Sequence, residues 1–194
     1  MHYIIPIQKR IFKSLNEISR NYGIHTEIAD DINNHFSNDN MYKDDYLLSI
    51  SYFQILKDST ISMFKAAFNI HPAPLPEGRG LFPSFWLLLY PTINGRYYQT
   101  VHLMTNRIDG GEIVVQSSVQ GQKAHCSSSN YMLCCTKLGC ELLESINFIG
   151  GNTNFTFPGK ESYFSFPRSI DVIRFWKNGN RFFRWRDISK IFLM

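Results

Sequence analysis

Residues 67 to 80 read AFNIHPAPLPEGRG, and this stretch decides how the rest of the chain is interpreted. Its apolar start is typical of a buried strand, and on an extended segment Asn69 and His71 share one face. The three prolines between residues 72 and 76 then exclude a helix, because proline fixes φ and has no backbone N–H. We therefore expect a strand that ends in a stiff loop, with an amide and an imidazole held at the strand end.

The composition is that of a globular protein. The chain has 194 residues, of which 44% are hydrophobic and 19% are charged, and this length suffices to bury a core. The net charge of +4 suits a site for an anionic small molecule. It falls short of the dense basic patch that nucleic-acid binding requires, so we expect no nucleic-acid partner.

The cysteines lack the spacing of a metal site. Cys126, Cys134, Cys135 and Cys140 form no CxxC pair and have no histidine placed to complete a zinc site, so we expect reduced thiols and no metal. No apolar run is long enough to span a bilayer, and the N-terminus lacks the order of a signal peptide. The expected location is therefore cytoplasmic, without a membrane partner.

Strand patterns and helix patterns alternate along the chain, which predicts an α/β fold around a mostly parallel, Rossmann-like sheet. The expected strands are 46–56, 67–71, 97–104 and 112–119, and the expected helices are 7–22, 59–67, 84–91 and 130–149. We predict a catalytic domain over residues 1–150 that lacks the first strands of the sheet. Residues 151–194 are aromatic and carry a turn signal at Asn178-Gly179, which predicts a short C-terminal β-hairpin extension.

The candidate catalytic residues follow the expected strands. Asn69 and His71 end one strand and Asp109 lies in the turn after another, where α/β sheets bind their ligands. An amide can donate to a developing oxyanion, and one such donor is worth roughly 10²–10³ in rate. A nearby carboxylate would orient the imidazole and raise its pKa. No nucleophile elbow is present, so these groups suit direct acyl transfer to an amine.

Two motifs resemble the signature of the folate-dependent formyltransferases. Residues 69–80 match the family's N-x-H before a loop containing Leu-Pro, and residues 101–116, VHLMTNRIDGGEIVVQ, match its second pattern, H-x-M-x(4)-D-x-G-x-I-x-x-Q. The segment KLGCELL, residues 137–143, resembles the family's LGAELL helix. The resemblance covers about residues 14 to 149. The residues that match the second pattern are His102, Met104, Asp109, Gly111, Ile113 and Gln116.

The resemblance implies a donor and a mechanism. The donor would be N10-formyltetrahydrofolate, and an amine would attack its formyl carbon while Asn69 and protonated His71 stabilise the oxyanion. Asp109 would hold His71 and help to remove the amine proton. The folate would lie against one strand end and against the loop of residues 105–112. The implied contacts are Ser51, Tyr52, Phe53, Gln54, Ile55, Leu56, Thr105, Ile108 and Gly110.

The tail implies an acceptor. Residues 163–183, YFSFPRSIDVIRFWKNGNRFF, resemble the tail of the sugar N-formyltransferases, which act on nucleotide-linked amino-deoxysugars destined for cell-surface glycans such as the O-antigen of lipopolysaccharide. Arginine and lysine would bind the pyrophosphate, and an uncovered sheet edge favours a homodimer. The implied acceptor contacts are Pro76, Arg79, Gly80, Lys160, Tyr163, Phe166 and Arg168.

Several alternatives stay open at this point. The acceptor could be another amine, such as a purine precursor or an aminoacyl-tRNA, or the chain could be a truncated relative that binds ligands without catalysis. Strand alternation predicts a structural role for His102. Arg79 could brace the glycine turn, and Tyr163 and Phe166 could pack a hairpin at a dimer interface. Phe85 and Trp86 are expected in the core.

Overall fold

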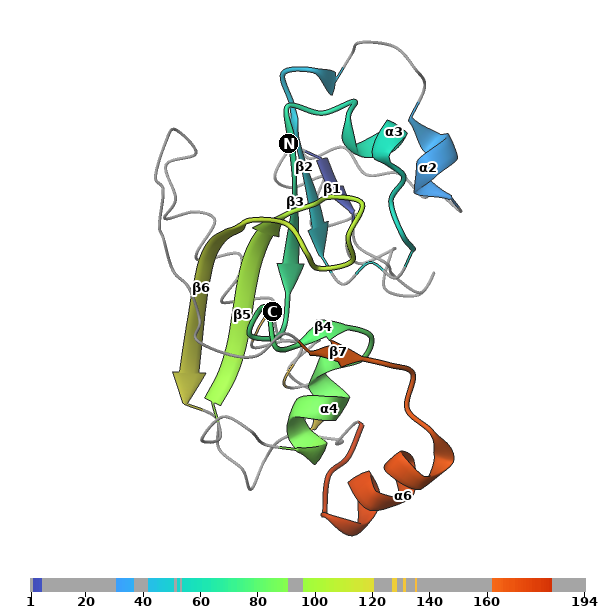
Figure 1. Cartoon of the computed structure of the whole chain (residues 1–194), viewed down its shortest axis with the longest axis vertical. Coiled ribbons are helices and arrows are strands. Elements are labelled where there is room, and N and C mark those ends of the chain that lie inside the picture. Colours follow the sequence, from blue (N-terminus) through green and yellow to red (C-terminus); the bar gives the residue numbers. More distant parts are fainter. Residues whose placement is uncertain are drawn as a thin grey trace, which may run out of the picture. The chain divides into compact units, whose positions relative to one another are not determined.

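The computed structural model describes residues 2–4, 31–36, 42–50, 52, 54–90, 96–120, 127–128, 131, 135 and 162–182. The chain divides into two compact units, Met1–Phe68 and Asn69–Met194 (Figure 1). The helix expected at 7–22 and most of the one expected at 130–149 lie outside the described residues.

The first unit contains a parallel strand pair and two short helices. Strand β1 (His2–Ile4) pairs with β2 (Tyr46–Ile50) in parallel. Helix α2 (Ile32–His35) begins at Asp31, whose side chain accepts the backbone N–H of Asn33, as an N-cap should. Helix α3 (Asp58–Ile61) follows β2. Edge-to-face and stacked rings at 5.0–5.3 Å form an aromatic cluster of Phe36, Tyr42 and Phe64.

Strand β3 (Ala66–His71) carries the chain from the first unit into the second. The five-stranded sheet has the order β1-β2-β3-β5-β6. Ala67, Phe68, Ile70 and His71 are buried, which confirms the buried strand predicted from the sequence. The prolines follow it directly.

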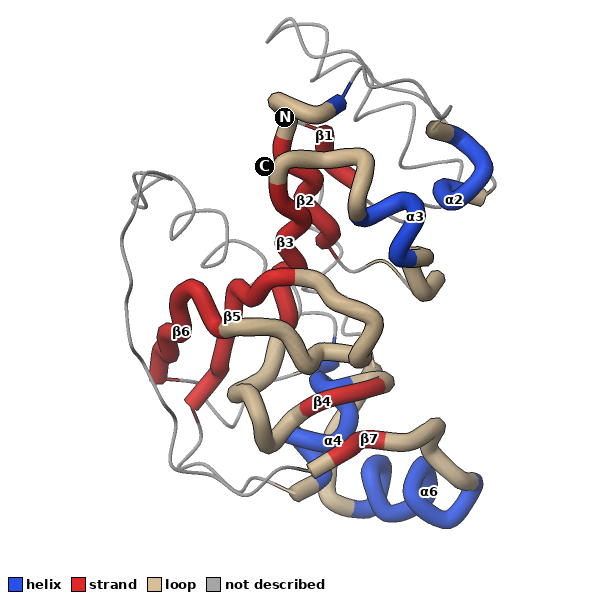
Figure 2. Tube along the Cα trace, turned by 45° about the horizontal axis from the view of Figure 1, so that its top comes forward, coloured by secondary structure: helices blue, strands red, loops and turns tan. Residues whose placement is uncertain are grey.

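Strands β5 (Arg96–Leu103) and β6 (Ile113–Gln120) form an antiparallel pair in the second unit, and Figures 1 and 2 show them side by side. Both strands were predicted and are confirmed. Their register shifts between Val101 and His102, because Val101 pairs with Val115 whereas His102 pairs with Ile113. Such irregularities re-aim side chains next to active sites.

Two helices and two short strands complete the described part of the second unit. Helix α4 (Pro83–Leu89) confirms the helix predicted at 84–91. It packs against α6 (Ser169–Lys177) through a shared core of Phe85, Leu89 and Phe175. Strand β4 (Arg79–Gly80) pairs in parallel with β7 (Tyr163–Phe164), and Figure 1 draws the two strands next to each other.

The predicted C-terminal β-hairpin is wrong in the described part of the tail. Residues 163–164 join β4, and residues 169–177 form α6. The aromatic content suggested strands, but Val172 and Phe175, three residues apart, face α4 at helical spacing. Asp171 caps the helix by accepting the backbone N–H and the guanidinium of Arg168. The predicted turn at residues 178–179 ends α6, with Gly179 at φ 78°.

Candidate active site

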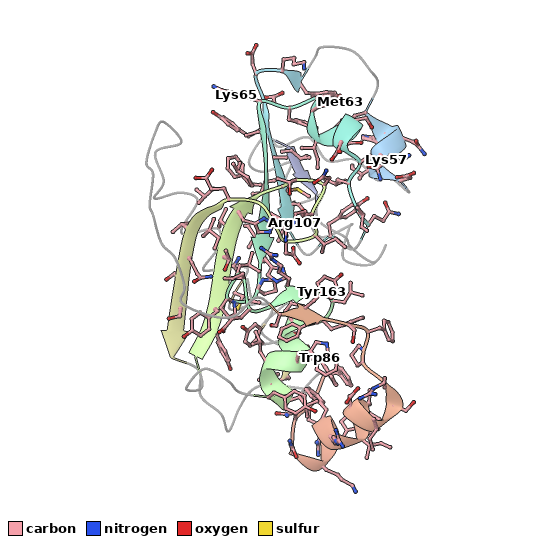
Figure 3. The ribbon with its side chains drawn as sticks, viewed as in Figure 1. Lys57, Met63, Lys65, Trp86, Arg107 and Tyr163 are labelled. Carbon is pink, nitrogen blue, oxygen red and sulfur yellow. The ribbon has the colours of Figure 1, made fainter. Side chains whose placement is uncertain are left out.

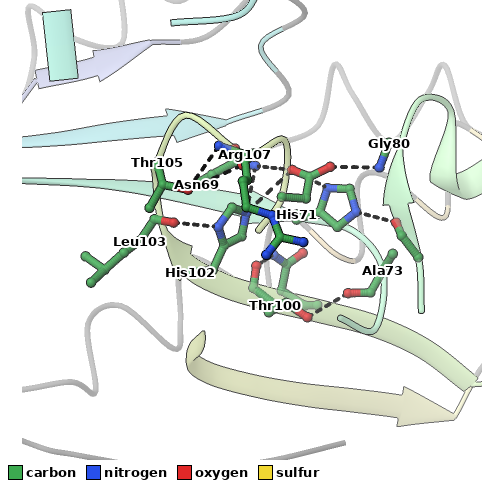
Figure 4. A network of polar contacts seen from close by, with 12 residues as sticks. Asn69, His71, Ala73, Gly80, Thr100, His102, Leu103, Thr105 and Arg107 are labelled. Carbon is green, nitrogen blue, oxygen red and sulfur yellow. Dashed lines mark hydrogen bonds and ion pairs between the residues drawn. The ribbon is translucent and has the colours of Figure 1, made fainter. Parts of the chain in front are cut away.

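The fold brings together the three residues that the sequence singled out. Asn69 and His71 stand on β3, and Asp109 lies in the loop between β5 and β6. Asp109 Oδ1 lies 3.3 Å from the Asn69 amide nitrogen Nδ2 and 3.5 Å from His71 Nδ1 (Figure 4). Forty residues of chain separate Asn69 from Asp109, so tertiary structure alone creates this contact.

The loop that carries Asp109 is shaped by a close backbone approach. Leu103 N–H donates to Glu112 O at 2.8 Å and closes the loop. A Cβ on Gly111 would lie 1.8 Å from Leu103 O, so this position excludes every other residue. Asp109 itself has φ 47°, in the left-handed region, which aspartate tolerates better than most residues. This geometry gives a physical reason for the Asp-x-Gly part of the motif.

The proline-rich loop is tied to β5 and β6 by buried hydrogen bonds. Thr100 Oγ1 donates to Ala73 O at 2.6 Å. Gln116 Nε2 donates to Thr100 Oγ1 at 2.7 Å and to Leu75 O at 3.3 Å. These bonds explain why a glutamine ends the second motif. The loop therefore holds the end of β3, and with it His71, in a fixed position.

The tautomer of His71 is set by a backbone carbonyl. His71 Nε2 lies 2.7 Å from Gly78 O, and because a carbonyl only accepts, Nε2 carries the proton. Nδ1 therefore faces Asp109. Burial lowers the pKa of His71 by more than Asp109 and the bond to Gly78 raise it. The expectation of a raised pKa is thus wrong in its net direction, because the side chain is only 6% exposed.

Asp109 stays ionised at every ordinary pH. Burial raises the pKa of its carboxyl group, but the charge that His71 carries when protonated, the neighbouring His102 and the hydrogen bond from the Gly80 N–H outweigh burial and lower the pKa to about 2. The Gly80 N–H donates to Oδ2 at 2.8 Å. Near pH 7 the cluster therefore contains a carboxylate next to a mostly neutral imidazole.

His102 belongs to this cluster, which the sequence analysis missed. The sequence suggested a structural role, but His102 Nε2 lies 3.2 Å from Asn69 Nδ2 and 3.5 Å from Asp109 Oδ1. Its Nδ1 donates to Leu103 O at 2.8 Å, so Nε2 accepts from the Asn69 amide in the neutral tautomer. The signal was present in the second motif, where His102 stands seven residues before Asp109.

The four side chains can bind a developing negative charge and move a proton. The Asn69 amide is a donor whose direction is fixed by His102 and Asp109. Neutral His71 has a lone pair on Nδ1 that can take a proton, and Asp109 stabilises the imidazolium that results. The arrangement supplies a donor, a base and an orienting carboxylate, which are the groups that direct acyl transfer needs.

The implied folate contacts divide between the two units. In the second unit, Thr105 and Ile108 are exposed and Gly110 is half-buried, all in the loop of Asp109. In the first unit, Gln54 and Ile55 are exposed and Tyr52 is half-buried, and burial raises the pKa of Tyr52. Leu56 is buried and serves the core. Ser51 and Phe53 lie outside the described residues.

The implied acceptor contacts lie around β4 and β7. Pro76, Arg79 and Gly80 are half-buried, whereas Tyr163 and Phe166 are 54% and 69% exposed (Figure 3, where Tyr163 is labelled). Lys160 lies outside the described residues.

Some of the residues near this surface have structural contacts of their own. The Arg168 guanidinium contacts Asp171 at 3.2 Å, which stabilises α6. Phe85 is buried as predicted, but Trp86 is only half-buried, and its Nε1 donates to Ser165 O at 2.8 Å. Of the four cysteines, Cys135 is described, and its buried thiol donates to Tyr98 O.

No group of three or more histidine, cysteine, aspartate and glutamate side chains is arranged to hold a metal ion within the described ranges. Among the helices given above, none has the length and apolar character needed to cross a bilayer.

The family follows from comparison with known proteins. The model of the formyl transferase family matches residues 19–138, more than half of the chain. The chain belongs to the formyl transferase family. The bifunctional polymyxin resistance protein ArnA of Wigglesworthia glossinidia brevipalpis is 35% identical over 96 residues, which are 48% of this chain and 14% of that protein. The resemblance inferred from the motifs is confirmed at the level of the family.

Solved structures of formyltransferases share the fold. A 4-N formyltransferase from Francisella tularensis superposes with a TM-score of 0.51 at 22% identity, over 70% of this chain and 52% of that one. The methionyl-tRNA formyltransferase of Clostridium thermocellum gives 0.53 at 13% identity, over 73% and 62%. These likenesses confirm the Rossmann-like α/β fold. The chain spans only part of each relative.

Proposed function

We propose that this protein transfers a formyl group from N10-formyltetrahydrofolate to the amine of a nucleotide-linked amino-deoxysugar. The observation that carries the proposal is the contact of Asn69, His71 and Asp109 at the end of β3, in a chain of the formyl transferase family. An amide donor, an imidazole and a carboxylate in contact are suited to acyl transfer and need no covalent nucleophile.

The protein side of the reaction follows from the tautomers. The amine attacks the formyl carbon, and the negative charge that develops on the formyl oxygen is bound by Asn69 Nδ2–H, which exchanges its hydrogen bond to His102 or Asp109 for one to that oxygen. His71 takes the amine proton at Nδ1, the atom that faces Asp109. The Asp109 carboxylate stabilises the imidazolium. As the oxyanion collapses, the bond between the formyl carbon and N10 breaks, and the imidazolium returns its proton to N10 of the leaving tetrahydrofolate. The protonated His71 of the sequence-based mechanism thus appears after proton transfer and not before it, because burial keeps the imidazole neutral beforehand.

The residues around Asp109 fit the donor. The folate supplies an activated formyl group, and its ring requires an apolar, flat surface. Ile108 is 44% exposed beside the catalytic carboxylate, and backbone groups of the same loop are available for the polar edge of a pterin.

The acceptor side fits a nucleotide sugar. Tyr163, Phe166 and Phe82 are exposed aromatic side chains, and Phe82 and Phe166 contact each other edge to face at 5.1 Å between ring centres. Exposed rings of this kind can stack on a nucleobase, and nearby Arg79 and Arg168 can bind pyrophosphate.

The test is a formylation assay with a panel of amines. The protein is incubated with N10-formyltetrahydrofolate and, separately, with nucleotide-linked 3-amino and 4-amino deoxysugars, glycinamide ribonucleotide and methionyl-tRNA. Mass spectrometry detects a gain of one formyl group on the acceptor. Transfer only to an amino sugar supports the proposal, whereas transfer only to another amine corrects the acceptor. Binding of donor and sugar without transfer contradicts the catalytic proposal and identifies a ligand-binding relative.

A further inference from the structure

The C-terminal strand β7 is hydrogen-bonded to the segment that leads out of the proline-rich loop. Arg79 and Gly80 of β4 pair with Tyr163 and Phe164 of β7. Leu81 N–H donates to Phe164 O at 2.9 Å. Just before β7, the N–H of Ser162 donates to Pro76 O at 3.3 Å. The segment 76–81 is therefore held from one side by the tail of the chain.

The same segment is bonded to two catalytic side chains from its other side. Gly78 O accepts a hydrogen bond from His71 Nε2–H at 2.7 Å, and Gly80 N–H donates one to Asp109 Oδ2 at 2.8 Å. The first bond decides which nitrogen of His71 carries the proton, and the second orients the carboxylate. Both bonds come from backbone atoms, so they depend on where the backbone of residues 78–80 lies.

Close packing leaves this backbone little freedom. A Cβ on Gly80 would lie 2.4 Å from Phe164 O, and one on Gly78 would lie 2.5 Å from Ala73 Cβ and 3.4 Å from the Phe164 ring. Phe164 also stacks on Trp86 of α4, with 6.1 Å between ring centres. The tail thus touches the catalytic segment with both its backbone and a side chain.

We propose that β7 is a positioning element for catalysis, which keeps His71 in the tautomer with the proton on Nε2 by fixing Gly78 and Gly80. The kinetic part of this inference rests on the proposed function, whereas the tautomer part does not. If β7 loosens, Gly78 O moves away from Nε2. The imidazole can then place its proton on Nδ1 and donate it to Asp109. An Nδ1 that already carries a proton cannot accept one from the amine.

Two variants loosen β7 in different ways. Ser162→Pro removes the N–H that bonds Pro76 O. Phe164→Ala removes the ring over Gly78 and keeps every backbone bond. Ser162→Ala, which keeps the N–H, is the control for the first. Ser169→Pro is the control for a proline in the tail, because the first position of a helix such as α6 tolerates proline. Phe164→Leu tests rescue by a side chain of similar bulk.

The tautomer is measured by two-bond ¹⁵N–¹H correlation of the imidazole rings in the full chain at constant pH, with the His71 signals assigned from His71→Gln. Asp109 and His102 are the titratable groups that face this ring. We expect the proton on Nε2 in the wild type and in both controls. In Ser162→Pro and Phe164→Ala, a second population with the proton on Nδ1 should appear, and Phe164→Leu should reduce it.

Kinetics supply the second measurement. In the two loosened variants kcat should fall about tenfold, the loss expected from about one misplaced hydrogen bond, while KM for the acceptor should change less than twofold. Phe164→Ala keeps the proposal testable if Ser162→Pro does not fold. A wild-type proton on Nδ1, or a fall in kcat with an unchanged tautomer in both variants, overturns the proposal. A tautomer change in proteins that transfer no formyl group supports β7 as the positioning element and contradicts only the proposed function.

Discussion

The polar cluster at the end of β3 and the aromatic surface of the tail differ in how their side chains are held. In the cluster, Asn69, His71 and Asp109 are fixed by several hydrogen bonds and are buried or nearly so. On the aromatic surface, which we define as Phe82, Tyr163 and Phe166, the residues are 37%, 54% and 69% exposed. Under the proposed function, the catalytic groups are preorganised, whereas the acceptor is recognised by side chains that a ligand would cover. Substitutions in the two regions should therefore change different kinetic constants.

The largest effect is expected from Asp109→Asn. The amide keeps the shape of the side chain but removes the charge that stabilises protonated His71, so kcat should fall about 10³-fold, within the range of acid–base contributions. Formyl transfer at saturating substrates is the measurement. Asp44→Asn, an exposed aspartate in a turn, is the control. A loss below tenfold would remove Asp109 from the mechanism.

Asn69→Ala should come next. It removes the only side-chain amide in contact with the cluster among the described residues, and roughly 10²–10³ in kcat should be lost with one oxyanion donor. Asn34→Ala removes an exposed amide bonded to Asp31 and should leave the rate unchanged. If Asn69→Ala changed KM and left kcat intact, the amide would bind substrate without stabilising the transition state.

The cluster should also make stability depend on pH. Asp109 and His71 both bind protons more weakly in the folded protein than in the unfolded chain, so the unfolded chain gains protons first and stability falls on acidification. The contribution of neutral His71 to stability is lost as the pH falls below about 6.5, the ordinary pKa of histidine in an unfolded chain. Asp109, with a pKa of about 2 against 3.8, contributes about 2 kcal/mol that is lost between about pH 4 and pH 2.

Urea unfolding at several pH values checks this dependence. His71→Gln should flatten the curve between about pH 7 and pH 5, and Asp109→Asn should flatten it below about pH 4. A wild-type stability that rises on acidification would contradict the burial of a neutral His71.

His102→Phe should have a smaller effect on rate. The ring keeps its volume, but Asn69 Nδ2 loses an acceptor, so the amide is oriented by Asp109 alone. We expect kcat to fall about tenfold, which corresponds to about one hydrogen bond. Thermal unfolding measured in parallel separates this effect from destabilisation. An unchanged kcat in a folded variant would return His102 to a purely structural role.

The smallest effect is expected on the aromatic surface. Phe166→Ala removes a ring that is 69% exposed, so stability should change by less than about 0.5 kcal/mol. KM for the nucleotide sugar should rise a few-fold, because stacking on one ring is worth about 1 kcal/mol, and kcat should hold. Ile173→Ala, an exposed apolar residue of α6, is the control. Equal KM values for the two variants would remove Phe166 from the acceptor site.

The sequence by itself determined the α/β fold, the strand that ends in Asn69 and His71, and Asp109 as the third member of the polar cluster. These features could be predicted because proline, glycine and strand alternation constrain the backbone locally. Each of the two motifs also has a defined number of residues between its members. The second motif also includes Gly111, but only the structure explains why this position requires glycine, because a Cβ there would collide with Leu103 O.

Tertiary structure decided the rest. The register shift at Val101–His102 turned a residue expected to be structural into a partner of Asn69, and a register is a property of two strands and not of one. Burial reversed the expected pKa direction of His71, because the cost of burying a charge depends on everything packed around it. The aromatic residues of the tail suggested a hairpin, but its described residues form a helix that packs against α4 and a strand that pairs with β4. Packing against α4 outweighs the local strand propensity of these residues.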